Sequence, residues 1–440
     1  MPSKISRRQL LKLGAIASAG VLAACAPKVV EKIVKETVVV AATPAPIEQI
    51  TLRTLGTGRE EIWSAFNEAH PNLTVEDVPI TGDKFEKLTT MFATGDPPDL
   101  FNTSDVNWCK DRDIAVVQHV VLDEYLTRDE AEFDWNDIYP TITKYMKMPD
   151  GHYYFIPQWV NSNIMAYNVE LFDEAGVPYP TKDWTWDDMV QAGKELTKFD
   201  DGMAMQYGKV TTFGWWGEYY YYQRQAGLEN WLSPDGRDVY MDTPEAIEGL
   251  RFYLDCIMTH RISDKPGESL EGGFLGGGYA MWNFIHTGSW PGITAAAIKW
   301  DIMVPPKGTR IEGGEIALDS TAIGRGSKHL EESWTYLKWN SGKEGGKVWV
   351  QVGVPPIRKS VNAETWVPRK DMPDYPLNPS IYFDAMPYNM PVHWPPGSWD
   401  AWDILQKRVD LMLEGKMTPE ETCNEAAEEM RGLIASGGKS

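Results

Sequence analysis

The sequence predicts an α/β protein with two doubly wound lobes joined by a hinge that the chain crosses several times. Three observations lead to this fold class. A chain of 440 residues is long for a single hydrophobic core, so two lobes are the default. Strand-like and helix-like segments alternate along residues 49–105, as in a doubly wound sheet. Three polar or Pro-containing stretches later break the pattern, where a chain would pass between lobes.

The first lobe shows this alternation most clearly. Ile50 and Leu52 alternate as in a strand, and a Gly-rich turn then leads into a helix. A second strand and a second helix precede a third strand that ends near residue 101. Ligands of such sheets bind beyond the carboxyl ends of the strands. Residues 56–59 and 102–105 are therefore expected to line a cleft.

The first predicted crossing lies within residues 150–199. An aromatic strand is followed by a polar joint at residues 158–163 and then by a second apolar strand. Trp159 is unusual among the amides of this joint. It is suited to be a platform for a ligand in a cleft, and the alternative is a Trp wedged under a loop. Thr185 and Asp188 form a capping-box pattern, which predicts the start of a helix.

Two more crossings are predicted at the Pro-containing stretches 304–308 and 352–358. Between them the pattern predicts a strand and a helix, and after them two long helices with apolar stripes. The predicted boundaries are residues 48–158 plus 310–350 for lobe 1 and residues 159–309 plus 351–440 for lobe 2.

Residues 1–24 have the pattern of an export signal that is removed from the mature protein. Basic residues precede an apolar run that is too short to span a membrane as a mature helix. Residues 6–12 resemble a twin-arginine signal, and residues 22–25 resemble a bacterial lipobox with Cys25 as the lipidated first residue. A plain secretory signal with an incidental cysteine is the alternative. Residues 25–47 then form a tether, and the rest of the chain is expected to be soluble.

The composition of the chain argues against several classes of partner and cofactor. The formal charge of −21 argues against nucleic acid as a partner and against binding to anionic lipid by surface charge. Cys109, Cys256 and Cys423 are scattered and contain no CxxC, so neither a zinc site nor a disulfide framework is indicated, although one disulfide stays open. No motif indicates a cofactor or a metal.

Several motifs, taken together in chain order, resemble one protein family. They lie at residues 93–100, 150–157, 167–176, 185–188 and 278–290. In these motifs the chain resembles the family 1 extracellular solute-binding proteins of bacterial ABC importers, the carbohydrate type related to maltose-binding protein. The resemblance implies a class II periplasmic-binding-protein fold that closes on its ligand. It also implies a monomer at the outer face of the cell membrane, held there only by its lipid anchor, which delivers its solute to the permease subunits of an ABC transporter.

A carbohydrate is the expected ligand. A Trp ring can cover the apolar face of a sugar, while amide, hydroxyl and charged groups bond its hydroxyls. Asp105 and Asp319 would accept hydroxyl protons and Arg358 would donate, whereas each aromatic residue could instead pack in a core. The candidate ligand-binding residues are Asp105, Trp159, Asn161, Trp215, Trp216, Tyr219, Trp282, Asn283, Ser289, Trp290, Asp319 and Arg358.

Two alternatives stay open. The same scaffold could bind another solute, such as a peptide or a polyol, because the aromatic run at residues 215–222 is richer than the family's usual pattern. A secreted glycoside hydrolase or lyase is disfavoured, because no spacing in the sequence points to the paired carboxyls that such chemistry needs. We therefore expect no enzymatic activity.

Overall fold

The computed structural model describes residues 48–103, 119–148, 150–285, 287–296, 298–368, 376–391 and 395–437. The predicted export signal, the tether and the lipidation site at Cys25 lie outside the described residues. No helix among the described residues is long and apolar enough to cross a membrane.

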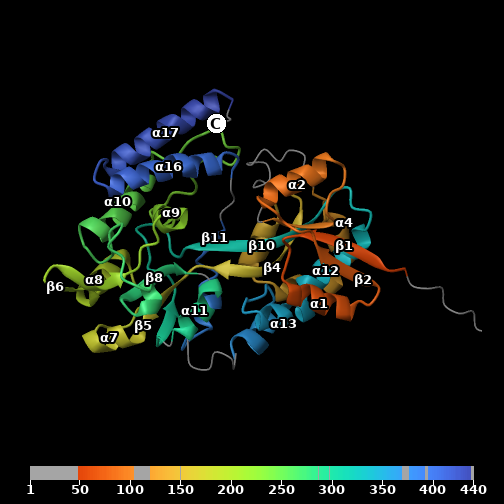
Figure 1. The fold of residues 1–440 in the computed structure, drawn as a ribbon, viewed down its shortest axis with the longest axis horizontal. Helices are drawn as coiled ribbons and strands as arrows, with labels where there is room; N and C mark the ends of the chain where they lie inside the picture. The colour runs from red at the N-terminus through yellow and green to blue at the C-terminus, as the bar shows by residue number, and fades with distance from the viewer. Residues whose placement is uncertain are drawn as a thin grey trace, which may run out of the picture. The chain divides into compact units, whose positions relative to one another are not determined.

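The described residues form two sheets (Figure 1). In the first sheet, β1 pairs in parallel with β2 and β3, which confirms the predicted alternation of strands and helices. The order continues from β3 to β10 and β11, and β4 pairs with β10. Its strands are β1 (Ile50–Leu55), β2 (Leu73–Asp77), β3 (Leu100–Thr103), β4 (Phe155–Ser162), β10 (Glu315–Ile323) and β11 (Met390–Pro391).

The second sheet has the order β6-β7-β8-β5-β9. Its middle strand β8 is parallel to β7 and antiparallel to β5. The strands are β5 (Ile164–Asn168), β6 (Lys198–Asp200), β7 (Met203–Lys209), β8 (Tyr279–Ile285) and β9 (Trp300–Met303).

One group of helices belongs with the first sheet (Figure 1). Among them, α1 packs against β2, α12 and α13. The group comprises α1 (Glu60–Ala69), α2 (Lys84–Ala93), α4 (Asp123–Arg128), α5 (Glu130–Phe133), η1 (Trp135–Asp137), α6 (Pro140–Met146), α12 (Leu330–Asn340), α13 (Lys343–Gln351), α14 (Lys359–Val361) and η4 (Asn362–Trp366).

A second group of helices follows or packs on the second sheet. The predicted capping box at Thr185 is confirmed, since its side chain accepts from the Asp188 amide and the Asp188 carboxylate bonds back to Thr185. The group comprises α7 (Val169–Ala175), α8 (Trp186–Leu196), α9 (Trp216–Gln225), α10 (Pro244–Met258), η2 (Gly273–Gly276), η3 (Thr287–Ser289), α11 (Trp290–Ala295), α15 (Ile381–Asp384), α16 (Ser398–Leu413) and α17 (Pro419–Ala435).

The chain passes between the sheets at places that differ in part from the expected ones. β4 stays in the first sheet as far as Ser162 and β5 starts the second sheet at Ile164, so the change falls at Asn163 and not after residue 158. The expected crossing at 304–308 lies between β9 and β10, which are in different sheets. Residues 352–358, in contrast, remain beside the first sheet, because Pro356 bridges to Trp159. The exact lobe boundaries stay a prediction.

Candidate ligand-binding site

One face of the β4–β10 pair is partly exposed. Asp319 lies opposite Trp159, and Ala317 lies opposite Asn161. Residues directly opposite each other in antiparallel strands point to the same face. These four residues are half-buried, whereas their neighbours along both strands are buried. They therefore share one partly exposed face of the pair, which we call the ribbon face.

The end of the ribbon face at Asp319 meets the carboxyl ends of β1 and β3. Asn102, in β3, donates its amide Nδ2 to Asp319 Oδ1, and Lys84 Nζ donates to Asn102 Oδ1 at 2.9 Å. Burial raises the pKa of Asp319, against the opposing effects of the Asn102 hydrogen bond and the charges of Lys84 and Arg59. The expected cleft-lining segments at 56–59 and 102–105 thus supply groups at this end.

A glycine makes room for the lysine of this cluster. Gly56 has φ 69°, in the left-handed region, and a Cβ at this position would come within 3.2 Å of Lys84 Cδ. A larger residue at position 56 would therefore strain the backbone and press on the side chain that bonds Asn102.

The other end of the ribbon face is the junction of the sheets. Glu315 starts β10, and its amide donates to Asn163 Oδ1 at 2.7 Å, while the Asn163 amide donates to the Glu315 carbonyl at 2.8 Å. Tyr221, in α9, donates its hydroxyl to Glu315 Oε2. Burial raises the pKa of Glu315 to about 7, although the Tyr221 hydrogen bond and the charge of Arg224 act in the opposite direction.

Two tryptophans stand at the start of α9, next to Tyr221. Trp215 and Trp216 are half-buried, and their ring centroids lie 5.7 and 5.8 Å from that of Tyr221. They connect through Tyr221 to Glu315 and so to the ribbon face. Of the predicted residues, the structure therefore brings together Trp159, Asn161 and Asp319, and it places the aromatic pair beside Tyr221, whose hydroxyl bonds Glu315 in the same strand as Asp319.

Three predicted residues are instead buried in cores. Tyr219 is 1% exposed, and its ring packs against Trp231 and Tyr253. Trp290 is 2% exposed, and its ring packs against those of Trp300, Trp366 and Tyr382. Asn283 is fully buried, and its side-chain amide donates a hydrogen bond to the Tyr222 hydroxyl. The rings of Tyr219 and Trp290 pack on core aromatic rings and the Asn283 amide bonds Tyr222, so none of the three lies on the ribbon face and we do not keep them as contacts.

Trp282 and Ser289 lie elsewhere. Both are half-buried, and the Trp282 ring packs against Phe274 at 5.9 Å. No contact within the described residues joins either side chain to the ribbon face. Asp105 lies outside the described residues.

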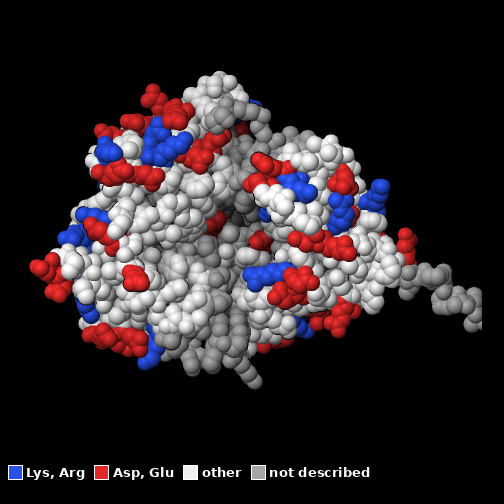
Figure 2. Space-filling view, viewed as in Figure 1, with Lys and Arg blue, Asp and Glu red and all other residues white. Residues whose placement is uncertain are grey.

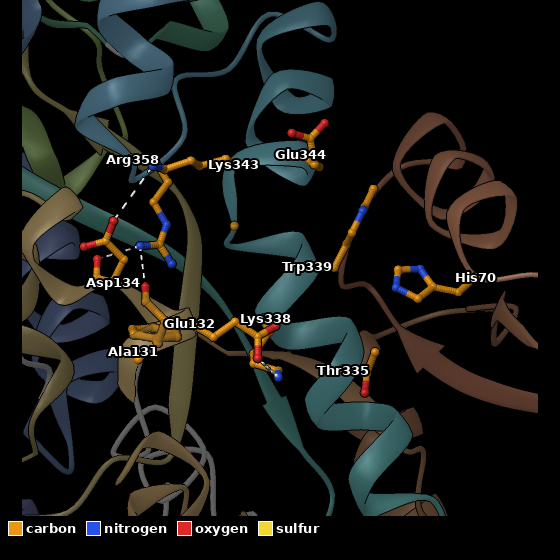
Figure 3. Close-up of a pocket in the computed structure, with 12 residues that line it drawn as sticks. His70, Ala131, Glu132, Asp134, Thr335, Lys338, Trp339, Lys343, Glu344 and Arg358 are labelled. Atoms are coloured by element: carbon orange, nitrogen blue, oxygen red, sulfur yellow. Dashed lines mark hydrogen bonds and ion pairs between the residues drawn. The ribbon is translucent and has the colours of Figure 1, made fainter. Parts of the chain in front are cut away.

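Arg358 was expected to donate hydrogen bonds to the ligand, but in the structure it donates them to backbone carbonyls. It is 3% exposed; Nε donates to the Ser341 carbonyl at 2.7 Å, and Nη1 donates to the carbonyls of Phe133 and Asp134 at 2.6 and 2.9 Å. It lines a cavity of about 430 Å³ between α5, α12 and α13 (Figure 3). Burial lowers the pKa of the guanidinium. The residues lining this cavity include none of the ribbon face.

The cysteines and possible metal ligands add no further site. Cys256 and Cys423 are free and buried, so they do not form a disulfide with each other, and Cys109 lies outside the described residues. Within the described residues there is no group of three or more His, Cys, Asp or Glu that could hold a metal ion.

Sequence reasoning missed several residues that the structure places at the site. Asn102 falls in a segment that the strand-end rule had selected, but no motif singled out Lys84 or Tyr221. Glu315 could have been found, because Glu315 and Asp319 are the two polar residues of the run EIALD, four positions apart and so on the same side of a strand.

The surface view shows a hollow in the middle of the visible face. Acidic atoms show in this hollow and basic atoms lie beside it, while most other charged side chains lie on the outer parts of the face (Figure 2).

Two sheets with their helices, joined through the β4–β10 pair, define a two-lobed α/β protein. The chain belongs to the bacterial extracellular solute-binding protein family, whose model matches residues 51–347. This membership confirms the resemblance seen in the sequence motifs. As a member of an extracellular family, the protein acts outside the cytoplasm.

Individual relatives carry sugar-related names. An arabinooligosaccharide-binding protein from Halalkalibacterium halodurans is 36% identical over 120 residues, which span 27% of this chain and 25% of that protein. The fold is similar to that of an ABC substrate-binding protein from Listeria monocytogenes solved with cycloalternan (TM-score 0.71, 22% identity, 89% of this chain and 99% of that chain). It is also similar to the sugar-binding protein MalE from Xanthomonas citri (TM-score 0.73, 17% identity, 88% and 98%).

Proposed function

We propose that this protein binds a carbohydrate on the ribbon face and delivers it to the permease of an ABC transporter. The observation that carries the proposal is the composition of that face: Trp159 beside Asn161, with Asp319 opposite, all half-buried where the two sheets join. A sugar offers the complementary surfaces, since it has apolar C–H faces and hydroxyl edges.

One atom of the ribbon face lacks a partner. Asn161 Oδ1 is buried, and no hydrogen-bond donor reaches it within the described part of the chain. A buried acceptor without a partner costs about 1–3 kcal/mol. A ligand hydroxyl that donates to Asn161 Oδ1 would remove this cost, so the site favours a ligand rich in hydroxyl groups.

The aromatic residues supply the apolar part of the binding free energy. If a sugar removes ~50 Å² of apolar area from water on one Trp face, the gain is about 1 kcal/mol. Trp159, Trp215 and Trp216 together would then contribute about 3 kcal/mol. Hydrogen bonds to charged groups such as Asp319 contribute about 1.5–3 kcal/mol each, before the entropy cost of association.

Two of the similar proteins support the same ligand class by their names. One of them is named for binding arabinooligosaccharides, and one similar structure was solved with the oligosaccharide cycloalternan. The proposal extends to what the sequence predicted outside the described residues: a lipid anchor at Cys25 and a monomeric protein at the outer face of the membrane. Ligand contacts with both lobes would favour the closed form by population shift.

A thermal-shift panel tests the ligand class. Arabinotriose, maltotriose, cycloalternan, ribitol and a tripeptide are each added to the mature protein. A sugar at 100 times its Kd should add ~2.7 kcal/mol to the free energy of unfolding. A shift with one or more sugars supports the proposal. A shift with the peptide or the polyol while every sugar is silent would overturn it, and release of shorter sugars during incubation would show an enzyme instead.

A further inference from the structure

Glu315 continues the ribbon face toward the second sheet. Glu315, Ala317 and Asp319 are alternate residues of β10 that precede the irregularity in pairing between Asp319 and Ser320. Alternate residues of a strand point to the same side. The Glu315 carboxyl is therefore at the end of the face that carries Trp159 and Asn161, and it is 5% exposed.

The two oxygens of this carboxyl differ. Oε2 accepts the hydroxyl hydrogen of Tyr221, which belongs to α9 and packs in the same hydrophobic cluster as Met165 and Met281 of the second sheet. The hydrogen bond thus joins the second sheet's core to a strand of the first sheet. No donor among the described residues reaches Oε1, so within the described part of the chain one acceptor oxygen of this buried acid has no hydrogen bond.

No cation forms a bond with this carboxyl within the described residues. The charged or titratable groups that face it come from α9: Tyr221, Tyr220 and Arg224. Arg224 directs its Nη1 to the Glu229 carbonyl at 2.5 Å and to the Tyr220 hydroxyl at 3.3 Å. Burial therefore dominates, and the pKa of Glu315 is raised to about 7.

The remaining neighbours are uncharged amides. Asn163, on the crossing between β4 and β5, donates its Nδ2 to the Phe284 carbonyl at 3.2 Å. Asn389, just before β11, donates its Nδ2 to Ser162 Oγ at 2.6 Å and to the Asn163 carbonyl at 2.7 Å. Both side-chain amides thus donate to other groups at the junction of the sheets, and neither carries a positive charge that would offset the charge of the Glu315 carboxylate.

We propose that Glu315 is a specificity-determining residue of the carbohydrate site, where its open oxygen accepts a hydrogen bond from a ligand hydroxyl. This inference rests on the proposed function. Hydrogen bonds to ionised groups are about 1 kcal/mol stronger than bonds between neutral groups, which corresponds to a roughly fivefold change in affinity. The carboxyl is mainly protonated at pH 6 and mainly ionised at pH 8, so the sugar should be held more tightly at pH 8.

The proposed hydrogen bond between the ligand and Glu315 also determines whether binding releases or takes up protons. A ligand that bonds the ionised form lowers the pKa of Glu315 in the complex, so binding near pH 7 releases protons. The number of protons released can be measured by calorimetry in buffers of different ionisation enthalpy. This readout does not depend on any variant being stable.

The experiment compares four proteins at pH 6, 7 and 8 by isothermal titration calorimetry. The probe is arabinotriose. If another sugar of the thermal-shift panel gives a larger shift, that sugar is used instead. The proteins are the wild type, Glu315→Gln, Tyr221→Phe and the control Glu312→Gln. Glu312 is three residues from Glu315 and pairs with Lys307 at 2.9 Å, outside the ribbon face.

The expected result is a roughly fourfold rise in wild-type affinity from pH 6 to pH 8, with proton release at pH 7. Glu315→Gln should lose both, and Glu312→Gln should keep both. Tyr221→Phe removes a hydrogen bond that lowers the pKa of Glu315, so the midpoint of the rise should move to higher pH.

The inference is overturned if a sugar binds the wild type with the same affinity at pH 6 and pH 8, or if Glu315→Gln keeps the pH dependence. Proton uptake in place of release would also overturn it. If no sugar binds the wild type at any of these pH values, the proposed function itself fails. The two failures are therefore distinguishable.

Discussion

Trp159 and Asp319 lie directly opposite each other in the β4–β10 pair, at the place where a ribbon from the first sheet reaches toward the second. The indole and the carboxyl thus share one face, although the residues are 160 positions apart (319 minus 159). This pairing puts an apolar platform and a hydrogen-bond acceptor side by side, which is the combination that recognition of a sugar requires.

Replacing Trp159 should weaken sugar binding more than it weakens the fold. Trp159→Ala removes one stacking face, worth about 1 kcal/mol, so affinity should fall about fivefold. Trp159→Phe should retain part of the affinity, because a smaller aromatic face remains. Calorimetry with the sugar selected by the thermal-shift panel measures both. Equal affinity of the alanine variant and the wild type would remove Trp159 from the site.

Replacing Asn161 should have opposite effects on binding and stability. Asn161→Ala removes the unpartnered Oδ1, so the ligand-free protein should be as stable as the wild type or slightly more stable. The sugar loses an acceptor, and affinity should fall by about 1–3 kcal/mol, or roughly five- to 150-fold. Urea unfolding and calorimetry report the two quantities separately. A variant that loses stability and keeps its affinity would show that Asn161 is structural.

Glu315 should make stability depend on pH. Its pKa is raised from 4.5 to about 7 by burial, so its contribution to stability is fully present below pH 4.5 and is lost as the pH rises through 7. The difference of 2.5 units, from 7 minus 4.5, corresponds to about 3 kcal/mol. Urea unfolding from pH 4.5 to 8 should show this loss in the wild type relative to Glu315→Gln. If the free energies of unfolding of the wild type and of Glu315→Gln changed in parallel with pH, the raised pKa of Glu315 would be contradicted.

Arg358 should matter for stability and not for affinity. Arg358→Met leaves the carbonyls of Phe133, Asp134 and Ser341 without their donor, and should destabilise the protein by about 3 kcal/mol. Affinity for the sugar, measured well below the melting temperature, should stay within a factor of two of the wild type. A large loss of affinity in a folded variant would return Arg358 to the ligand site.

The sequence singled out three residues that the structure places on one face of the β4–β10 pair, although it predicted neither the pairing nor the face. A Trp among amides between two strands, and an Asp in an apolar strand, stand out because they break a local pattern, and Trp159, Asn161 and Asp319 do share one face. The alternation of strands and helices was also readable, because each segment has its own period.

Where aromatic residues have no such contrast with their neighbours, the sequence does not distinguish those that pack in a core from those that bind a ligand. The helix α9 contains Tyr219, Tyr220, Tyr221 and Tyr222, and all four are 0–1% exposed, so the helix is buried on every side. A run of tyrosines looks the same in a core and in a binding site, and only the packing partners decide. The same holds for Trp290, which closes a core with other aromatic rings, and for Arg358, whose acceptors are backbone carbonyls that no sequence pattern reveals.

A crystal structure of the protein with the sugar selected by the panel tests the central claim most directly. The account predicts that a sugar ring lies against Trp159, with hydroxyls bonded to Asn161 Oδ1 and to the carboxyl of Asp319. A sugar bound elsewhere, for example in the cavity beside Arg358, with the ribbon face untouched, would contradict it.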